Sequence, residues 1–272
     1  MFIIKKILKF FIPEFYLRFA LRLIYDPKKR GINELLIQKK FKVKYKNKNL
    51  FTLRDFGGST AARGRSLFTK EVDTINWINS FDQASNFIDV GANIGIFSLY
   101  AASRGHNVLS FEPESLNFCL LNLNINDNSF NDKIIAYPIS IHNKEILGIL
   151  EVPNLQWGKS NNQFSDSAKN EDINNSFKQG SIGIPLDESI NAIGYIPDYI
   201  KIDVDGNEIF VLKSMQDLIK KQTFKSILVE VDENINESLE IKKLLDQGSY
   251  KLISKNEIIT NSNVYNYIFS PK

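Results

Sequence analysis

The chain from residue 86 onward alternates between short apolar runs and stretches with apolar residues at helical spacing. Such alternation is typical of strand–helix repeats that build a parallel sheet. Strands are predicted at residues 86–90, 107–112, 133–141, 146–152, 198–205, 225–231, 250–254 and 264–269, and helices at 71–81, 96–102, 113–126, from 185, from 208 and at 236–247. The last two strands read as a hairpin, and 146–152 as a hairpin with 133–141. The pattern therefore predicts an α/β fold with a Rossmann-like, seven-stranded, mostly parallel sheet and an antiparallel last strand, plus N-terminal helices.

The first 55 residues follow a different pattern. Residues 1–25 mix apolar and basic side chains at near-helical spacing, with Pro13 as a break. Charges interrupt this stretch far short of the ~20 apolar residues that a membrane span needs, and no small-residue cleavage site follows. Two interpretations stay open: these helices pack on the catalytic domain, or they lie on an anionic membrane surface or a charged glycan. Residues 41–54 alternate and predict a hairpin that turns at 47–49.

Two polar stretches interrupt the core domain, which is predicted to span residues 56–272. Residues 57–60 begin a segment that is expected to be flexible. Residues 153–184 form an insert rich in Asn, Ser, Gln and Lys up to residue 181. A loop this long in a compact domain is normally functional or disordered. We expect it to cover the substrate side of the site, with disorder as the alternative.

Composition narrows the class of protein. With 43% hydrophobic and 12% aromatic residues, the chain can form a globular core. The net charge of +3 hides an asymmetry: residues 1–50 contain 14 Lys or Arg and 3 Asp or Glu, a net +11, so residues 51–272 carry −8. One cysteine, Cys119, excludes an internal disulfide and favours a reducing, cytoplasmic location, peripheral to the membrane if the basic N-terminus binds there. No nucleic-acid-binding module is present, and no nucleic-acid partner is predicted.

Residues 86–95, NFIDVGANIG, carry the first functional signal. Gly91 and Gly95 allow a sharp turn that brings backbone amide groups close to a ligand at a helix N-terminus. Asp89 selects among ligands, because a carboxylate beside a phosphate is repelled by roughly 4 kcal/mol at 4 Å and an effective dielectric near 20. S-adenosylmethionine has an ammonium and a sulfonium and no phosphate, so this acid favours it over a dinucleotide.

A second acid supports the same ligand. Glu112 ends the next predicted strand, 21 residues after Gly91, which fits a carboxylate that accepts hydrogen bonds from ribose hydroxyls. A nicotinamide-dependent oxidoreductase stays as an alternative, although the second glycine of Gly-x-Gly-x-x-Gly is missing. His142 follows a strand at the ligand-binding end, where a solvated turn residue is the more common role. The predicted cofactor contacts are Asp89, Gly91, Ala92, Asn93, Ile94, Gly95, Phe111, Glu112, Pro113 and Ser140.

Residues 198–208, DYIKIDVDGNE, carry the second signal. Side chains alternate along a strand, so Lys201, Asp203 and Asp205 are expected to share one face. A strand inside a parallel sheet is normally hydrophobic throughout, and unpaired buried charges cost several kcal/mol. These three charges are therefore predicted to face a polar cleft, with a purely structural Lys201–Asp203 ion pair as the alternative. Glu208 begins the next helix, where a carboxylate suits the helix dipole.

The chain resembles the FkbM family of class I S-adenosylmethionine-dependent methyltransferases. Four segments carry the resemblance: FIDVGANIG at 87–95, Phe111-Glu-Pro, Leu186-Asp after a Gly/Ser/Asn loop, and IKIDVDGNE at 200–208. It spans residues 68–270 and leaves out the basic N-terminus. Asp205 is shorter than the Glu that family members typically have there. The resemblance implies methylation of a hydroxyl on a sugar, glycan or secondary metabolite, with S-adenosylmethionine as cofactor and a small-molecule or glycan partner.

The catalytic hypothesis uses the second segment. Because a general base must reach the proton it removes and have a suitable pKa, we predict that Asp203 accepts the proton of the hydroxyl or holds the acceptor. Lys201 would set the charge of Asp203, and Asp205 and Glu208 would shape the substrate side. A resident metal is not predicted. A variant in which Asp203, Asp205 and Glu208 hold Mg²⁺ through oxygen atoms stays as an alternative. The oligomeric state stays open.

Overall fold

The computed structural model describes residues 39–57, 59–165, 176–235, 237–258 and 261–272. The chain divides into two compact units, Met1–Lys39 and Lys40–Lys272, and the account below concerns the second. The helices and the membrane contact predicted for residues 1–25 lie outside the described residues. None of the described helices is long and apolar enough to cross a bilayer.

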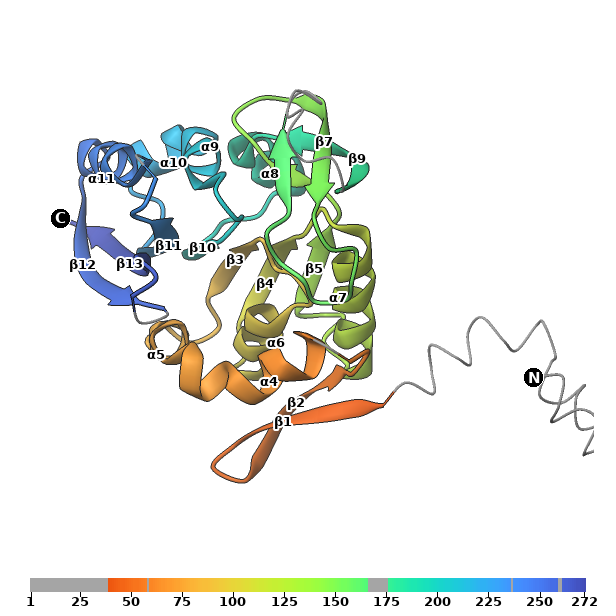
Figure 1. Cartoon of the computed structure of the whole chain (residues 1–272). Coiled ribbons are helices and arrows are strands. Elements are labelled where there is room, and N and C mark those ends of the chain that lie inside the picture. The colour runs from red at the N-terminus through yellow and green to blue at the C-terminus, as the bar shows by residue number, and fades with distance from the viewer. Residues whose placement is uncertain (1–38, 58, 166–175, 236, 259–260) are drawn as a thin grey trace, which may run out of the picture. The chain divides into compact units, whose positions relative to one another are not determined.

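A seven-stranded sheet forms the centre of this unit (Figure 1). Its strands run in the order β12 (Tyr250–Glu257), β13 (Val264–Pro271), β11 (Ser226–Asp232), β10 (Tyr199–Ile202), β3 (Asn86–Val90), β4 (Asn107–Phe111) and β5 (Ile134–Tyr137). The pairs β11–β10, β10–β3, β3–β4 and β4–β5 are parallel, and β13 is antiparallel to both of its neighbours. The predicted fold class is confirmed, including the antiparallel last strand.

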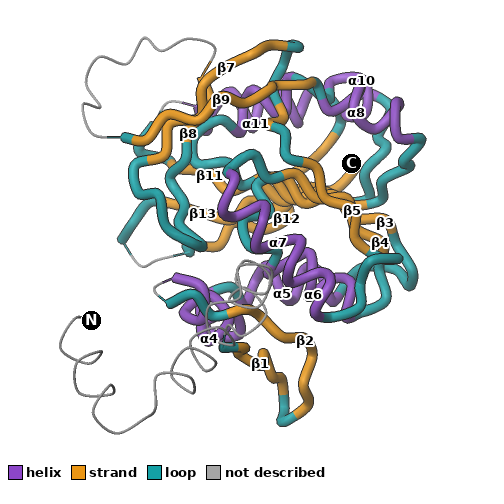
Figure 2. The backbone as a smooth tube through the Cα atoms, turned by 90° about the vertical axis from the view of Figure 1, so that its right-hand side faces the viewer, coloured by secondary structure: helices purple, strands orange, loops and turns teal. Residues whose placement is uncertain are grey.

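Helices cover both faces of the sheet (Figure 2). One face packs against α5 (Val72–Asn79), α6 (Ile96–Ser103) and α7 (Ser115–Asp127). The other packs against α8 (Leu186–Ile193), α9 (Glu208–Lys213), α10 (Gln216–Lys220) and α11 (Glu237–Gln247). Burial on both faces explains the near-continuous apolar runs of the central strands. Each face has its own hydrophobic core, and polar residues collect where the strands end.

The hairpin of β1 (Lys40–Tyr45) and β2 (Lys48–Arg54) belongs to the same unit as the sheet. Its turn lies at Lys46 and Asn47, both with positive φ, one residue before the predicted turn. Apolar hairpin side chains join the core under α5–α7, and the buried Arg54 donates two hydrogen bonds to Asp127 at the end of α7, at 2.7 and 2.9 Å. The domain boundary expected after residue 55 therefore moves to residue 39.

A second, small sheet replaces much of the predicted polar insert. It has the order β6 (Ser140–Ile141), β9 (Phe177–Ile184), β7 (Ile146–Val152) and β8 (Gln163–Ser165), and Figure 1 draws β7 and β9 above β5. The predicted strand 133–141 is thus split between two sheets, and β7 pairs with β8 and β9, not with β5. The expectation of one long loop was wrong, because backbone pairing stabilises strands that are rich in polar residues and glycine.

Helix α4 (Ser59–Lys70) begins where a flexible segment was expected, and residue 58 of that segment lies outside the described residues. Its buried positions, Thr60, Ala61, Gly64 and Leu67, lie at helical spacing. Most of them are small, which weakens the apolar pattern that marks a helix in the sequence. Gly64 allows the ring of Phe41 from the hairpin to approach closely. The helix therefore connects the hairpin to the sheet domain.

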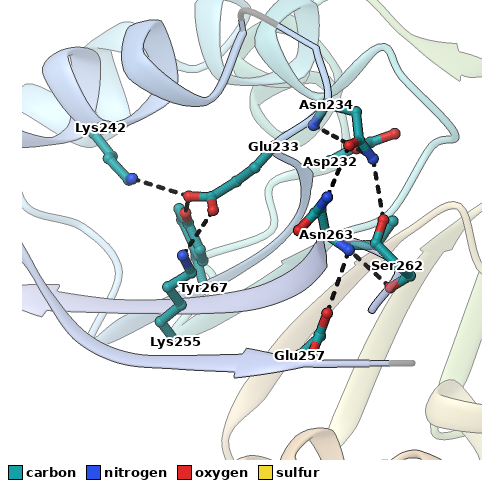
Figure 3. A network of polar contacts seen from close by, with 10 residues as sticks. Asp232, Glu233, Asn234, Lys242, Lys255, Glu257, Ser262, Asn263 and Tyr267 are labelled. Atoms are coloured by element: carbon teal, nitrogen blue, oxygen red, sulfur yellow. Dashed lines mark hydrogen bonds and ion pairs between the residues drawn. The ribbon is translucent and has the colours of Figure 1, made fainter. Parts of the chain in front are cut away.

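A polar network joins α11, β12 and β13 to the carboxyl end of β11 (Figure 3). Glu233, just after β11, pairs with Lys242 of α11 at 3.3 Å and with Lys255 of β12 at 2.7 Å, and it accepts a hydrogen bond from Tyr267 of β13. The hydrogen bonds from Lys255 and Tyr267 lower the pKa of Glu233 to about 2. One carboxylate thereby ties α11 and the last two strands to the end of β11.

Candidate active site

A cavity of about 460 Å³ opens where β3, β4, β10 and β11 end. This is the carboxyl edge of the parallel strands, where open α/β sheets bind ligands. Segments far apart in the sequence contribute to its wall. They are helix α4 and Glu71, the turn after β3, the end of β4, residues 139–142, residues 158–162 with Phe164, the loop after β10, and Glu230 of β11.

The glycine turn after β3 has the predicted shape but not the predicted hydrogen bonding. Gly91 has φ +81°, and a Cβ there would lie 1.8 Å from the carbonyl oxygen of Asp203, so only glycine fits. Every backbone N–H from Gly91 to Gly95 already has a protein acceptor: the Phe111 carbonyl (twice), Glu112, the Asn93 side chain and the Ala92 carbonyl. The expectation that these amides face a ligand was wrong. The turn has no spare donors for a phosphate.

Glu112 is the best-oriented acid of the cavity. Its Oε2 accepts from the Asn93 amide at 2.7 Å and its Oε1 from the Glu114 amide at 2.9 Å, so the backbone fixes the carboxyl group. Burial raises the pKa of Glu112 to about 8, although the two amide donors act against this shift. Each carboxylate oxygen can accept a second hydrogen bond, so a ligand hydroxyl can still bind.

The other predicted cofactor contacts fall into two groups. Gly91, Ala92, Asn93, Phe111, Pro113 and Ser140 line the cavity with Glu112. Ile94 and Gly95 are not among the lining residues: Ile94 is buried, and Gly95 is the N-cap of α6. These two residues shape the turn without facing the cavity.

Asp89 also lies behind the cavity wall and is not among its lining residues. It is fully buried, and its Oδ2 accepts a hydrogen bond from Ser98 of α6 at 2.5 Å. Burial raises its pKa, and Lys201, its neighbour in the pairing of β10 with β3, opposes that rise. Asp89 therefore does not attract a cationic ligand directly in this geometry. The carboxyl group acts on the charge of Lys201.

Lys201 is buried below the cavity and donates a hydrogen bond to Asp203 at 2.6 Å. Burial disfavours its charged form, but Asp203 and Asp89 outweigh that cost and raise the pKa of Lys201. Asp203 lines the cavity, whereas Lys201 does not. The ion pair that the sequence left as an alternative is present, with one partner facing the cavity.

The remaining charges of this segment do not form the predicted row. Strand β10 ends at Ile202, and Asp205 has φ +55° in the loop that follows, so strand alternation does not extend to it. Asp205 lines the cavity; burial and the nearby Asp203 raise its pKa to about 6. Glu208 is not among the lining residues. It accepts hydrogen bonds from the amides of Val204 and Gly206, which fixes the loop, and burial raises its pKa to about 7.

Part of the polar insert closes one side of the cavity. We call residues 157–162 the strap. The amides of Asn161 and Asn162 donate to Asp205 Oδ2 at 2.6 and 3.3 Å, and the Lys159 carbonyl accepts from the side chains of Asn93 and Asn117 at 2.8 and 2.9 Å. Residues 158–162 line the cavity, so this part of the insert covers one side of it, and its place on the substrate side stays a prediction. The strap gives Asp205 a clear role, since its carboxylate connects the loop after β10 to the cover.

Several lining residues were absent from the predicted site. Arg63 of α4 donates to the Gly158 carbonyl at 2.9 Å, and Glu71 lies just before α5; burial, followed by Asp203, raises the pKa of Glu71. His142 lines the cavity and stacks on Phe210 with ring centroids 5.0 Å apart. Glu230 lies near the carboxyl end of β11, and that position was the signal that could have identified it.

The described side chains give little support for a resident metal. Within the described ranges, no group of three or more His, Cys, Asp or Glu side chains could hold a metal ion. The three acids considered for Mg²⁺ are engaged elsewhere: Asp203 by Lys201, Asp205 by the strap and Glu208 by backbone amides.

Comparison with known proteins identifies the family. Residues 89–252 match the family described as "Methyltransferase FkbM domain", which is more than half of the chain. The chain belongs to the FkbM methyltransferase family. No curated protein matches it in sequence. The family match does not favour a nicotinamide-dependent oxidoreductase.

Solved structures place this FkbM chain in the class I methyltransferase fold. The METTL16 methyltransferase domain matches with a TM-score of 0.50 and 12% identity, over 81% of this chain and 82% of that one. A methyltransferase FkbM from Methylobacillus flagellatus matches with a TM-score of 0.49 and 15% identity, over 70% of this chain and 44% of that one. The FkbM chain thus spans less than half of the Methylobacillus protein. At such identities the likeness concerns the fold alone.

Proposed function

We propose that this FkbM domain transfers a methyl group from S-adenosylmethionine to a hydroxyl of a sugar, glycan or secondary metabolite. The observation that carries the choice of donor is the glycine turn, whose amides are all engaged while Glu112 faces the cavity. A dinucleotide needs free donors for its phosphates. A cationic, phosphate-free nucleoside needs acceptors, and five carboxyl side chains line this cavity.

The lining residues fit such a donor. Glu112 would accept hydrogen bonds from the ribose hydroxyls, and Phe111, Pro113 and Ser140 would line the nucleoside part of the site. The bound donor supplies a methyl carbon whose leaving group, a neutral thioether, is already activated. The protein must then align the acceptor and receive a proton, and alignment alone provides up to ~7–11 kcal/mol in well-oriented systems. Asp203, held by Lys201, positions the acceptor or accepts its proton in this proposal.

Calorimetric titration of the full chain tests the donor assignment. We expect S-adenosylmethionine to bind and Glu112→Gln to weaken its binding about 10–100-fold, because the new NH₂ group leaves one of the two backbone amides without its acceptor, which costs about 1–3 kcal/mol. Glu188→Gln is the matched control, because this residue is exposed on α8 and outside the cavity wall. Uptake of NADH with no binding of S-adenosylmethionine would contradict the proposal.

Labelled donor and a panel of sugars and glycans then test the acceptor class. We expect label in the ether-linked methyl of at least one hydroxylated acceptor. Asp203→Asn should transfer the methyl group more slowly while donor binding is kept. Transfer by Asp203→Asn at the parent rate would remove Asp203 from the mechanism, and label only on nitrogen or carbon atoms would contradict O-methylation.

A further inference from the structure

Five carboxyl side chains line the cavity, and Glu230 differs from the other four. Glu112 is held by two backbone amides, Asp203 by Lys201 and Asp205 by the strap, and Glu71 lies 3.8 Å from the Lys70 ammonium. The carboxyl group of Glu230 makes no hydrogen bond or ion pair with any of the residues that the structure describes. It lines the cavity and is half-buried.

The sheet register places Glu230 beside the Lys201–Asp203 pair. Ile202 of β10 is paired with Val229 of β11, so Asp203 and Glu230 follow at neighbouring positions. On its other side Glu230 is paired with Asn266 of β13, whose side-chain amide donates to Thr74 at 3.3 Å. The neighbouring strands therefore leave this carboxyl group free for whatever enters the cavity.

The charges around Glu230 keep its proton affinity high. Burial and the carboxylate of Asp203 raise the pKa of Glu230 to about 9; Lys201 opposes the shift, and Glu208 and Asp205 add to it. Glu71, just before α5, and Arg63 of α4 line the same cavity. A positive charge brought into the cavity favours the carboxylate and lowers this pKa. The donor's sulfonium is such a charge.

We propose that Glu230 is the catalytic residue that takes the proton of the acceptor hydroxyl, while Asp203 holds Lys201 and the acceptor. The inference rests on the proposed function. The O–H bond breaks and its proton goes to a Glu230 carboxylate oxygen, as the hydroxyl oxygen forms a bond to the methyl carbon. The carbon–sulfur bond breaks and its electron pair stays on sulfur. Glu230, now a carboxylic acid, returns its proton to water.

Proton release on donor binding tests this role without a known acceptor. S-adenosylmethionine and S-adenosylhomocysteine share ammonium, carboxylate and ribose, and differ in the sulfonium charge. Titration of the full chain near pH 8, in phosphate and in Tris, gives the protons released by each ligand. We expect up to about one proton more with S-adenosylmethionine, because the sulfonium lowers the pKa of Glu230. Glu230→Gln should abolish this difference, and Glu71→Gln, in the same cavity wall, should keep it.

The outcomes separate the two proposals. If the parent chain binds neither ligand, the proposed function fails. If it binds both but the proton difference is absent, persists in Glu230→Gln, or is lost in Glu71→Gln, Glu230 does not face the sulfonium and its role is overturned.

With an acceptor from the sugar panel, Glu230→Gln should lower kcat about 10²–10⁴-fold with donor binding kept. If Glu230 takes the proton, kcat should rise toward basic pH as Glu230 ionises. Asp203→Asn should keep this rise and Glu230→Gln should lose it. If instead Asp203→Asn loses the rise and Glu230→Gln keeps it, Asp203 takes the proton.

Discussion

Gly91 lies where the turn after β3 touches the loop after β10, two loops that both line the cavity. A methyl group there would meet the Asp203 carbonyl oxygen at 1.8 Å in a backbone with φ +81°. We expect Gly91→Ala to lower the free energy of unfolding by about 3 kcal/mol or more, because overpacking adds to the cost of a positive φ.

Urea unfolding of Gly91→Ala against Gly105→Ala separates these two effects. Gly105 also has a positive φ, +97°, but nothing lies within 4 Å of a Cβ placed there. Its replacement should cost only about 1–2 kcal/mol, from backbone strain. Equal losses in the two variants would show that the contact between the loops does not matter for stability.

Single residues also show how far the sequence alone can locate a site. Glu112 was predicted from its position at a strand end and Asp203 from the unusual charges of its strand, and both line the cavity. Asp89 was predicted from its place before the glycine turn, yet it faces the buried side of α6, because the face of the sheet that a strand residue points to depends on tertiary packing. Glu230 was missed because its free carboxyl group becomes apparent only when the partners of the other acids are known.

At the scale of elements, the strap depends on Asp205. Its carboxylate accepts from two strap amides, so Asp205→Asn replaces part of that acceptor with an NH₂ group that cannot accept. We expect amide hydrogen exchange at Asn161 and Asn162 to become about 10–100-fold faster, since a charge-assisted hydrogen bond contributes about 1.5–3 kcal/mol. Hydrogen-exchange mass spectrometry measures this, with Glu188→Gln as control. Unchanged protection would mean that Asn93, Asn117 and Arg63 hold the strap without Asp205.

The predicted elements were most accurate where apolar periodicity is strong. Most strands of the main sheet follow apolar runs, although β12 is mixed, and the prediction of an antiparallel last strand is confirmed. Helix α4 was missed because its buried face is made mostly of small residues, and β8 and β9 were missed because they are rich in polar residues and glycine. Those three elements are held by contacts distant in sequence, which local patterning does not contain.

At the scale of the whole molecule, two sets of acids act on stability in opposite directions. The pKa values of Asp205, Glu208, Glu112 and Glu230 are raised to about 6, 7, 8 and 9 by burial, with Asp203 as a further cause for most of them. Their contribution to stability is complete below the unfolded values near 4 and is lost as the pH rises through 6 to 9. Glu233, with its pKa lowered to about 2, contributes above pH 4.5 and loses that contribution as the pH falls toward 2.

The ligand-free FkbM chain should therefore be most stable near pH 5, with Tm falling on both sides. Thermal unfolding between pH 3 and pH 9 measures this profile, and Glu230→Gln should flatten its basic limb because one of the raised groups is gone. A saturating cationic donor favours the carboxylate forms, so the Tm gain from S-adenosylmethionine should grow from pH 6 to pH 9 beyond that from neutral S-adenosylhomocysteine. A Tm that rises with pH across this range would show that the cavity acids are already ionised in the empty protein, and would contradict their raised pKa values.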